Sequence, residues 1–388
     1  MAALGQKWGA KMTCGVLKKG SEVASGVSGE TSGFDFEGMR FGVKAWRASA
    51  SGAREGGSPV APIVFVHGFA QQASTWDDVA QLLTDAGAKC FGFELAGHGA
   101  GACSAGGAPA EHPGFFDLRF QARALLAFCE AVARDVGVAP VLVGYSMGGR
   151  VALQAACLVA GDLQDGDQLD RISLRSSAAF APCGRTGRLD VAGAGQRDAA
   201  ATSAGDTVRM PAAAPFSALV LESAGLGPVD DAAREALCER NFVRAARVRD
   251  EGVSAFMDWW AGLPLFESQR ILPDEQRERL RAGRLANDAE SLALSFERAG
   301  AHAMPSQGES IRALCELAAK GIPVSYLAGE LDAKYCKVLA DLRAESQGAI
   351  SCRIVPAAGH NIHLEQPRAF GAVLEEVVES CTPKPAAP

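Results

Sequence analysis

Short, almost wholly apolar runs recur along the chain, and segments of helical length separate most of them. Runs of this length that end in Gly, Ser or Asp are typical of buried strands. The runs are APIVFVHGFA (61–70), AKCFGFELAGHG (88–99), PVLVGYS (140–146), SALVLESAGL (217–226), IPVSYLAGELD (322–332) and SCRIVPAAGH (351–360). The alternating stretch 34–48 predicts one or two edge strands, and the Ala-rich stretch 150–160 predicts a buried helix. Strands alternating with helices predict an α/β fold with a mostly parallel central sheet.

Other parts of the chain depart from this pattern. Residues 1–33 are rich in Gly, Ser, Ala and Lys and lack the apolar core of a secretory signal, which predicts a flexible tail before an α/β domain at 34–388. A transit peptide is the alternative, against which the absence of Arg from the tail counts. Residues 161–215 lack any sustained period and predict an irregular insertion. Residues 228–308 have a helical pattern rich in Arg and Glu, which predicts a helical cap between the sixth and seventh strands.

Composition narrows the classes of partner. The 388 residues carry a formal net charge of −7, with 48% hydrophobic and 21% charged residues, which indicates a globular protein with no affinity for nucleic acid or an anionic membrane. The 11 cysteines form no CxxC pair, so a reducing compartment is favoured over a secreted disulfide framework. No apolar run reaches transmembrane length. We therefore expect a cytoplasmic protein; its oligomeric state is not predicted.

The segment VGYSMGGR (143–150) places a single serine between glycines. Gly144, Ser146 and Gly148 fit G-x-S-x-G, and the pattern falls between a predicted strand and a predicted helix. That context is the one required of a nucleophile elbow, where the flanking glycines allow a sharp turn and keep the serine hydroxyl exposed. An ordinary Gly-rich turn is the alternative interpretation.

A serine hydroxyl needs a base before it can act as a nucleophile or as a base itself. His360 ends the last predicted strand and Asp332 ends the strand before it. The order Ser146, Asp332, His360 is that of α/β-hydrolase triads, so these residues are the predicted catalytic groups. His363 competes for the base role but lies further past its strand. Glu330 competes with Asp332 less well, because alternation points its side chain the other way.

The dipeptide HG at 67–68 follows the first buried strand. Backbone amides at this place, and after the nucleophile, commonly stabilise developing negative charge. We expect the oxyanion hole at the N–H groups of Phe69 and Met147, and we expect His67 and His98 to be structural.

Several segments beyond the triad resemble one family closely: the SHCHC synthases, in full 2-succinyl-6-hydroxy-2,4-cyclohexadiene-1-carboxylate synthases, of menaquinone and phylloquinone biosynthesis. The resemblance runs from about residue 63 to 370 without the insertion, and rests on GYSMGGR, F-x-x-W-W followed by LPLFESQ, RLAND, YLAGELDAKY and AGHNIHLEQP. It implies an α/β-hydrolase fold used as a lyase. The reaction is elimination of pyruvate from the enolpyruvyl adduct SEPHCHC, without a metal or an organic cofactor.

The family's substrate carries several carboxylates, which guanidinium groups grip in bidentate pairs. By resemblance, the substrate-binding residues are Tyr145, Arg150, Trp259 and Arg284. A third family arginine matches Arg234 best, with Arg240 as the alternative. The partner expected is therefore a small polycarboxylate.

The insertion of about 55 residues at 161–215 is a departure from the family. Because the preceding helix starts at the carboxyl edge of the sheet and runs back, the insertion is expected to leave the opposite edge, away from the serine. Two other functions compete with the lyase. A serine hydrolase of the same fold, acting on esters or carbon–carbon bonds, would suit an arginine-poor cap, and a non-catalytic binding protein would suit a degenerate triad.

Overall fold

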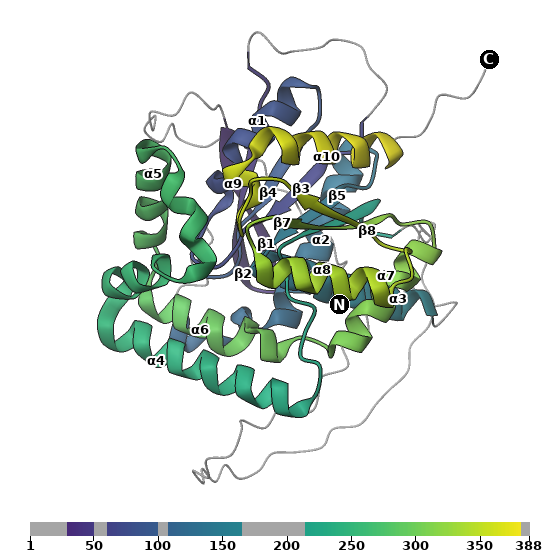
Figure 1. The fold of residues 1–388 in the computed structure, drawn as a ribbon. Coiled ribbons are helices and arrows are strands. Elements are labelled where there is room, and N and C mark those ends of the chain that lie inside the picture. Colours follow the sequence, from purple (N-terminus) through teal and green to yellow (C-terminus); the bar gives the residue numbers. More distant parts are fainter. Residues whose placement is uncertain (1–28, 50–59, 100–107, 165–213, 382–388) are drawn as a thin grey trace, which may run out of the picture.

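The computed structural model describes residues 29–49, 60–99, 108–164 and 214–381. Within these ranges the chain forms an eight-stranded sheet in the order β1-β2-β4-β3-β5-β6-β7-β8 (Figure 1). The strands are β1 (Gly29–Phe36), β2 (Met39–Trp46), β3 (Ile63–Val66), β4 (Cys90–Phe93), β5 (Val141–Tyr145), β6 (Ala218–Glu222), β7 (Val324–Gly329) and β8 (Ser351–Val355). β2 pairs antiparallel with β1 and with β4, and all other neighbours are parallel. The predicted mostly parallel α/β sheet is confirmed.

The first strand begins earlier than predicted. β1 starts at Gly29, so residues 29–33 of the expected tail are strand, paired with β2 from Gly29↔Trp46 to Phe36↔Met39. A two-residue turn joins the strands, and both Glu37 (φ 44°) and Gly38 (φ 86°) are left-handed, as the twist of a tight hairpin requires. The polar segment GETSG has little strand propensity, so its strand form depends on this pairing. The rest of the predicted tail lies outside the described residues.

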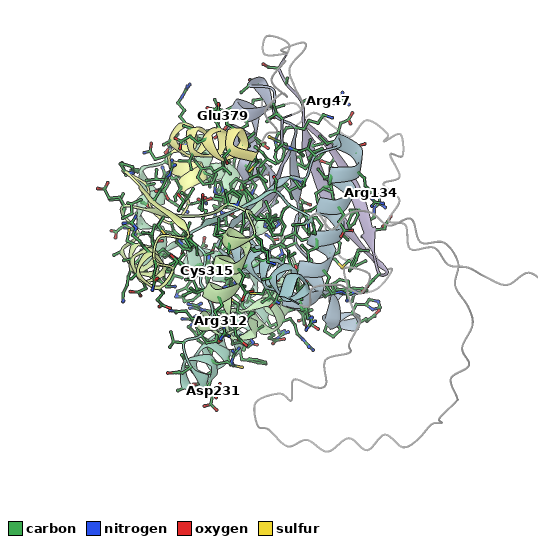
Figure 2. All side chains as sticks on the ribbon, turned by 90° about the vertical axis from the view of Figure 1, so that its right-hand side faces the viewer. Arg47, Arg134, Asp231, Arg312, Cys315 and Glu379 are labelled. Atoms are coloured by element: carbon green, nitrogen blue, oxygen red, sulfur yellow. The ribbon has the colours of Figure 1, made fainter. Side chains whose placement is uncertain are left out.

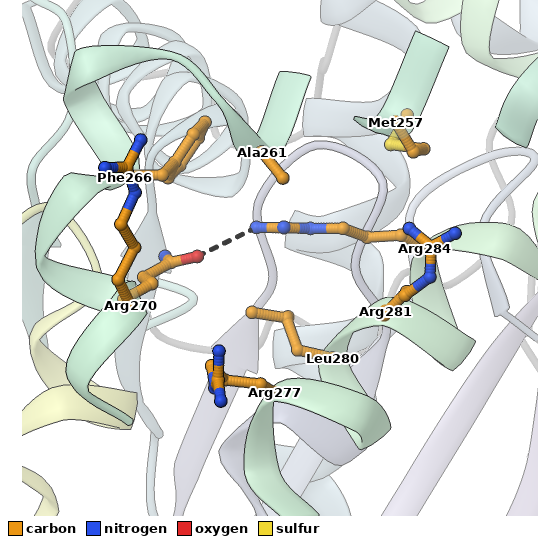
Figure 3. Close-up of a pocket in the computed structure, with 9 residues that line it drawn as sticks. Met257, Ala261, Phe266, Arg270, Arg277, Leu280, Arg281 and Arg284 are labelled. Carbon is orange, nitrogen blue, oxygen red and sulfur yellow. Dashed lines mark hydrogen bonds between the residues drawn. The ribbon is translucent and has the colours of Figure 1, made fainter. Parts of the chain in front are cut away.

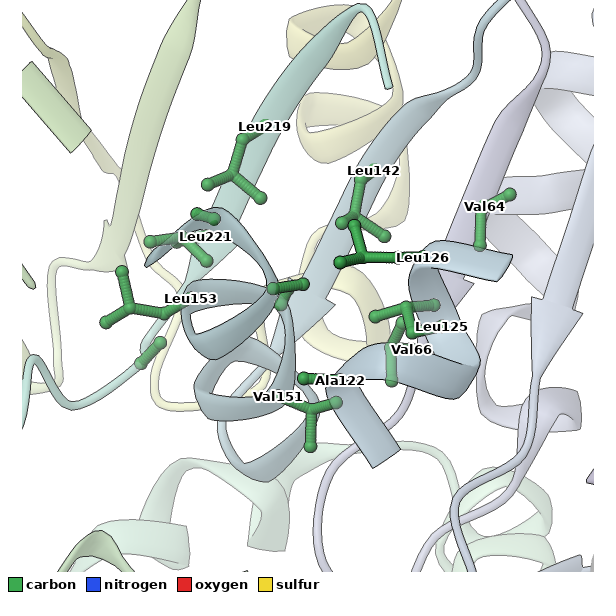
Figure 4. Close-up of a cluster of buried hydrophobic side chains, with 14 of the residues drawn as sticks. Val64, Val66, Ala122, Leu125, Leu126, Leu142, Val151, Leu153, Leu219 and Leu221 are labelled. Atoms are coloured by element: carbon green, nitrogen blue, oxygen red, sulfur yellow. The ribbon is translucent and has the colours of Figure 1, made fainter. Parts of the chain in front are cut away.

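Helices cover both faces of the sheet. Along β3, Val64 and Val66 pack on one face while Ile63 and Phe65 pack on the other, which is the two-residue alternation of a strand buried on both sides. The first face is covered by α2 (Leu118–Val136), α3 (Met147–Gln164), α7 (Gln307–Ala319) and α8 (Ala333–Glu345). Figure 4 shows Leu142, Leu219 and Leu221 of the sheet facing α2 and α3. The second face is covered by α1 (Asp77–Asp85) and α10 (Pro367–Cys381).

Charged side chains occupy the outer sides of these helices. Arg134 on α2, Arg312 on α7 and Glu379 on α10 are exposed at the periphery (Figure 2). Among the described helices, none is both long and apolar enough to cross a membrane. The cysteines of the described residues, such as the buried Cys90 and Cys129, are free thiols.

The chain between β6 and β7 is helical, as predicted. It comprises α4 (Asp231–Ala261), the 3-10 segment η5 (Pro264–Ile271), α5 (Asp274–Leu285), α6 (Ala289–Ala299), η6 (Ala301–Ala303) and α7. α4 begins with the side chain of Asp230 accepting the Ala233 N–H, and it is interrupted at Gly252 (φ 76°). α4 to α6, called the cap from here on, lie to one side of the sheet in Figure 1. Their apolar side chains, including Phe256 and Phe296, pack on Ala70 in the loop after β3.

The ends of the predicted insertion lie far from the serine turn. α3 continues to Gln164, and the described chain resumes at 214 before β6. Val141 pairs with Ala218, so β6 begins at the end of the sheet opposite Ser146. Residues 165–213 themselves lie outside the described residues. The remaining short elements are η1 (Ala73–Trp76), η3 (Pro109–Glu111), η4 (Pro113–Phe116) and α9 (Ile362–Glu365).

Candidate active site

Ser146 occupies the sharp turn between β5 and α3. Its φ of 49° is left-handed, a conformation that costs a non-glycine residue roughly 1–3 kcal/mol and that must be held by its surroundings. The neighbouring glycines explain how the turn fits. A Cβ on Gly144 would lie 2.7 Å from the carbonyl oxygen of Gly148, and one on Gly148 would lie 2.3 Å from that of Val66. The strand–turn–helix context expected of a nucleophile elbow is therefore present.

The structure brings the three predicted triad residues together. His360 Nε2 lies 3.2 Å from Ser146 Oγ, and His360 Nδ1 lies 2.7 Å from Asp332 Oδ2. Asp332 follows β7 and is also the N-cap of α8, because its Oδ1 accepts the Tyr335 N–H at 3.1 Å. Each carboxylate oxygen of Asp332 thus has its own partner, which fixes the orientation of the imidazole. The histidine and the aspartate are buried, whereas Ser146 is half-buried.

Burial lowers the pKa of His360, and the hydrogen bond and charge of Asp332 oppose that shift. The imidazole therefore remains neutral near pH 7, the state in which it can accept a proton. Neither competing residue has this geometry. Glu330 accepts the Ala357 N–H at 2.9 Å, and His363 Nδ1 lies 2.7 Å from a Glu222 oxygen.

His67 and His98 are built into the loops as expected. His67 Nδ1 lies 2.8 Å from the Gly68 carbonyl, and its Nε2 accepts the Leu95 N–H at 3.1 Å. Burial lowers the pKa of His67 to about 3 and that of His98 to about 4. Both are neutral, structural side chains at pH 7.

The two backbone amides predicted to form the oxyanion hole have no acceptor within the described residues. Met147 is the first residue of α3, so its N–H has no acceptor within the helix. The Phe69 N–H donates to no acceptor among the described residues. Phe69 is held by the cap, with its ring centroid 5.0 Å from that of Trp260 and 4.3 Å from that of Phe296. Free, fixed donors of this kind suit the predicted oxyanion hole.

The cap also contacts the loop that carries His360. Ser268 of η5 donates to Glu365 at 3.1 Å, and the other Glu365 oxygen accepts the Gly359 N–H at 2.6 Å. A Cβ on Gly359 would lie 1.9 Å from Ser268 Oγ, so only glycine permits this approach. The ring of Phe266, also on η5, meets the His360 ring edge-on at 5.8 Å. η5 therefore supports the position of His360.

Arg284 brings a guanidinium group into this region, and no carboxylate of the described residues pairs with it. It is 6% exposed, its Nη2 donates to Gln269 Oε1 at 3.1 Å, and its Nε is buried with no acceptor. Burial lowers its pKa, and interaction with Tyr145 opposes that effect. The Tyr145 ring lies between the rings of His360 and His363, at 5.3 and 4.9 Å. An unpaired buried cation next to the triad is suited to bind an anion.

A second group of positive side chains lies on α3 and α4. Burial and the charge of Arg240 lower the pKa of Arg150 to about 10, and Arg150 Nε is buried without a partner. The pKa of Arg244 is also lowered to about 10, by burial and by the charges of Arg240 and Arg150. Arg240 and Arg244 are four residues apart on α4 and so share one face of that helix. These three guanidinium groups form a cluster that a carboxylate would stabilise.

Arg234, which the resemblance predicts to bind substrate, makes hydrogen bonds within the protein. Its Nη1 donates to the backbone carbonyls of His302 and Met304 at 2.5 and 2.8 Å. It therefore ties α4 to the turn before α7. The alternative arginine, Arg240, is the one whose charge acts on Arg150.

The two adjacent tryptophans of α4 have different surroundings. Trp259 lies under the guanidinium of Arg247, 4.2 Å from the ring centroid. Trp260 contacts Phe69, whose N–H is a predicted oxyanion donor, and Phe266, whose ring meets that of His360. The resemblance names Trp259 as a substrate-binding residue, which stays a prediction. Trp260 was not singled out, because the order of two neighbouring aromatic residues does not show which one faces the sheet.

Sequence reasoning also missed Glu222. This carboxylate is fully buried; one of its oxygens accepts the backbone N–H of His363 at 3.1 Å, and the other lies 2.7 Å from the ring Nδ1 of His363. The His363 ring stacks on Trp76 at 3.7 Å. The second histidine in AGHNIH and an acid at the end of β6 were the available signals. Among the described residues, no group of three or more His, Cys, Asp or Glu side chains is arranged to hold a metal ion.

A strained serine at a strand–helix turn, with its acid and histidine after later strands of a mostly parallel sheet, defines a class of protein. The model of the Alpha/beta hydrolase family matches residues 63–373, and the chain belongs to this family. The predicted fold class is thereby confirmed.

Relatives with curated names and solved structures show which proteins of this family the chain is similar to. The 2-succinyl-6-hydroxy-2,4-cyclohexadiene-1-carboxylate synthase of Escherichia coli (strain SMS-3-5 / SECEC) is 28% identical over 325 residues, covering 83% of this chain and 96% of the relative. A Bacillus subtilis relative is 34% identical over 164 residues, which is 42% of this chain and 57% of that protein's length. The solved structure of MenH from S. aureus has a TM-score of 0.62 at 22% identity, over 88% of this chain and 99% of that one. An esterase from Thermogutta terrifontis follows at 0.59 and 18% identity, over 92% and 100%. Homologues thus carry the name to which the motifs pointed.

Proposed function

We propose that the protein is a lyase that eliminates pyruvate from SEPHCHC to give SHCHC. The observation that carries the proposal is the combination of a Ser146–His360–Asp332 triad with arginines that lack carboxylate partners beside it. A simple esterase has no need of several unpaired guanidinium groups, whereas a substrate with several carboxylates does. The names of the relatives support the same reaction.

In the proposed mechanism, His360 takes the proton of the Ser146 hydroxyl, and Asp332 stabilises the resulting imidazolium. The serine oxygen then removes the acidic ring proton next to the succinyl carbonyl. Negative charge develops on that carbonyl oxygen, where the N–H groups of Phe69 and Met147 can donate to it. The electron pair returns to form the ring double bond and breaks the bond to the enolpyruvyl oxygen. The His360 imidazolium gives its proton to the departing enolpyruvate, which becomes pyruvate; this restores the neutral triad, and no acyl-enzyme forms.

Arg150, Arg240 and Arg284 are assigned to the substrate carboxylates, and Tyr145 and Trp260 to the walls of the site. Arg234 and Trp259, the residues first matched to the family, are assigned to the structure of the cap. The substrate is thereby held with its acidic proton toward Ser146, which replaces a bimolecular encounter with a positioned one.

The test offers purified protein SEPHCHC and follows pyruvate release together with loss of substrate. Ser146→Ala is the control, because it removes the base and little packing, and its turnover should fall by orders of magnitude in a folded protein. A small neutral ester is offered in parallel. Rapid ester hydrolysis with no pyruvate from SEPHCHC would establish a serine hydrolase in place of the lyase, and full activity of Ser146→Ala would remove the triad from the mechanism.

A further inference from the structure

Next to the triad, the structure holds a second pair of an acid and an imidazole, formed by Glu222 and His363. Both side chains are fully buried. His363 Nδ1 lies 2.7 Å from one Glu222 oxygen, and the other oxygen accepts the His363 backbone N–H at 3.1 Å. The distance from imidazole to carboxylate equals the 2.7 Å between His360 and Asp332. Neither Glu222 nor His363 has a task in the mechanism proposed above.

The contacts of His363 indicate where its proton lies. Nδ1 faces a carboxylate oxygen and so carries the proton, whereas Nε2 is buried with no partner among the described residues. A second proton, on Nε2, would be a buried donor without an acceptor, which is costly. A carboxylate that accepts from two N–H groups is stabilised in its charged form. The arrangement therefore favours a neutral His363 and a negatively charged Glu222.

Tyr145 joins the second pair to the triad. It lies opposite Glu222 in the register of β5 and β6. Its ring contacts the ring of His363 at 4.9 Å and that of His360 at 5.3 Å. His363 in turn stacks on Trp76 at 3.7 Å. Because protein interiors are close-packed and transmit strain, a shift of His363 would displace Tyr145 and, with it, the imidazole of His360.

Other charged and titratable side chains also surround His360. From the cap, Phe266 of η5 meets its ring edge-on at 5.8 Å, and Arg284 of α5 lines a pocket together with Phe266 (Figure 3). The charge of Arg284 acts on Tyr145. The remaining groups are Asp332, Lys334 and Tyr335 at the start of α8, Glu222 at the end of β6 and Glu365 on α9.

Two of these carboxylates act on His360 in the same direction. Burial lowers the pKa of His360, whereas Asp332 raises it through its hydrogen bond and its charge. The charge of Lys334 lowers this pKa, and the charge of Glu222 raises it. Glu222 therefore favours the imidazolium, as Asp332 does, although its hydrogen bonds go to His363.

We propose that Glu222 and His363 are positioning residues for the proton transfer: the pair holds the His360 imidazole through Tyr145, and Glu222 supplies a second buried negative charge that stabilises the imidazolium. The inference rests on the function proposed above, in which His360 takes the Ser146 proton. Neither residue of the pair is assigned a contact with the substrate. Changing the pair should therefore alter proton transfer and leave substrate binding nearly intact.

The first test needs no substrate. The imidazole C–H signals of the six histidines are followed by NMR as the full-length protein is titrated with acid, and His360→Gln assigns the signal of His360. Glu222→Gln keeps the size of the side chain and removes its charge, so the His360 titration should move to lower pH by about half a pH unit or more. Glu94→Gln is the matched control and should leave the titration unchanged. Glu94 is also a buried carboxylate just after a strand, but it accepts the Ala73 N–H.

Pyruvate release from SEPHCHC supplies the second readout. Glu222→Gln should lower kcat about threefold or more, the factor that corresponds to half a pH unit, with KM within about twofold of the wild-type value. The acid limb of kcat/KM should move together with the NMR titration. His363→Asn keeps an N–H for the charged Glu222 but removes the ring, so kcat should fall while the acid limb stays at its wild-type position.

The proposal is overturned if the His360 titration is the same in folded Glu222→Gln as in the wild type, or if Glu94→Gln shifts it equally. A raised KM with an unchanged kcat in either variant of the pair would also overturn it, because the pair would then bind substrate. If Glu222→Gln does not fold, His363→Asn decides, and a wild-type kcat in that variant contradicts the positioning role. No pyruvate from the wild-type protein would instead contradict the lyase, and the NMR comparison would still decide whether Glu222 acts on His360.

Discussion

Glu222 is hydrogen-bonded to Ser146: the backbone carbonyl of Glu222, at the end of β6, accepts the Ser146 N–H at 2.9 Å, next to the paired strands β5 and β6. Its carboxylate at the same time binds the backbone and ring of His363, three residues after His360. Glu222 thus connects the turn at Ser146 to the segment that carries His360. The distance between Ser146 and His360 depends on this connection.

Glu222→Ala is expected to destabilise the fold and to reduce turnover. It leaves two buried donors of His363 without an acceptor, and each such group costs about 1–3 kcal/mol. We expect a loss of about 2–6 kcal/mol in the free energy of unfolding, measured by denaturant titration. Glu222→Gln keeps an acceptor of the same size and should lose markedly less. Equal losses in the two variants would contradict the role given to the carboxylate oxygens.

The pH dependence of turnover is expected to follow His360. Only the neutral imidazole can act as base, and burial lowers its pKa below the ordinary 6.5. kcat/KM should therefore stay level down to pH 6.5 and fall only at lower pH. Asp332→Asn removes the interactions that raise this pKa, so the acid limb should move further down while the plateau falls by roughly 10²–10⁴. An acid limb that moves up in Asp332→Asn would exclude His360 as the titrating group.

Stability should decrease in acid because of His67 and His98. Their folded-state pKa values, about 3 and about 4, lie below the ordinary 6.5, so the unfolded chain binds their protons first as pH falls. Above pH 6.5 the two histidines take nothing from the free energy of unfolding, because they are neutral in both the folded and the unfolded chain. Between pH 6.5 and 4 each removes about 1.4 kcal/mol per pH unit from the free energy of unfolding. His98→Gln should reduce the slope of the free energy of unfolding against pH by about 1.4 kcal/mol per pH unit, measured by denaturant titration over this range. An unchanged slope would show that His98 is protonated in the folded protein.

The arginine assignments separate binding from structure. Losing a hydrogen bond to a charged group costs about 1.5–3 kcal/mol, so Arg150→Ala, Arg240→Ala and Arg284→Ala should each lower kcat/KM for SEPHCHC roughly ten- to hundredfold. A small neutral ester, if turned over, should be affected much less. Arg234→Ala should instead lower the melting temperature, because two carbonyls of the turn at 302–304 lose their donor. Equal losses on both substrates would mean that the three arginines act through structure.

The parts of the site that could be predicted from sequence are those fixed by local geometry. Ser146 is marked by its glycines, and Asp332 and His360 by their places at strand ends, which a parallel sheet brings to one edge. Trp260 could not be separated from Trp259, because the helix phase that decides between them is interrupted at Gly252. The choice between Arg234 and Arg240 stayed open for a related reason: the carbonyl acceptors of Arg234 are 68 and 70 residues away along the chain.

Contacts made at long range explain the remaining gaps. In the local sequence Glu222 is a polar residue at the end of a strand, and its partner His363 is 141 residues further along the chain. The strand at 29–33 depends on the partner strand β2 rather than on its own composition. In both places the local sequence is neutral and the tertiary pairing decides the structure.

The approach of Ser268 to Gly359 has a consequence for how this scaffold can be redesigned. Engineers often treat a cap as a replaceable module that sets substrate preference and leaves the reaction centre untouched. Here the hydrogen bond from Ser268 to Glu365 makes the cap part of the structure that positions His360. A chimaera that receives a foreign cap must also receive a hydroxyl in the place of Ser268 and retain Gly359. Without these two residues, a chimaera that gains the substrate preference of the foreign cap would also have a displaced His360.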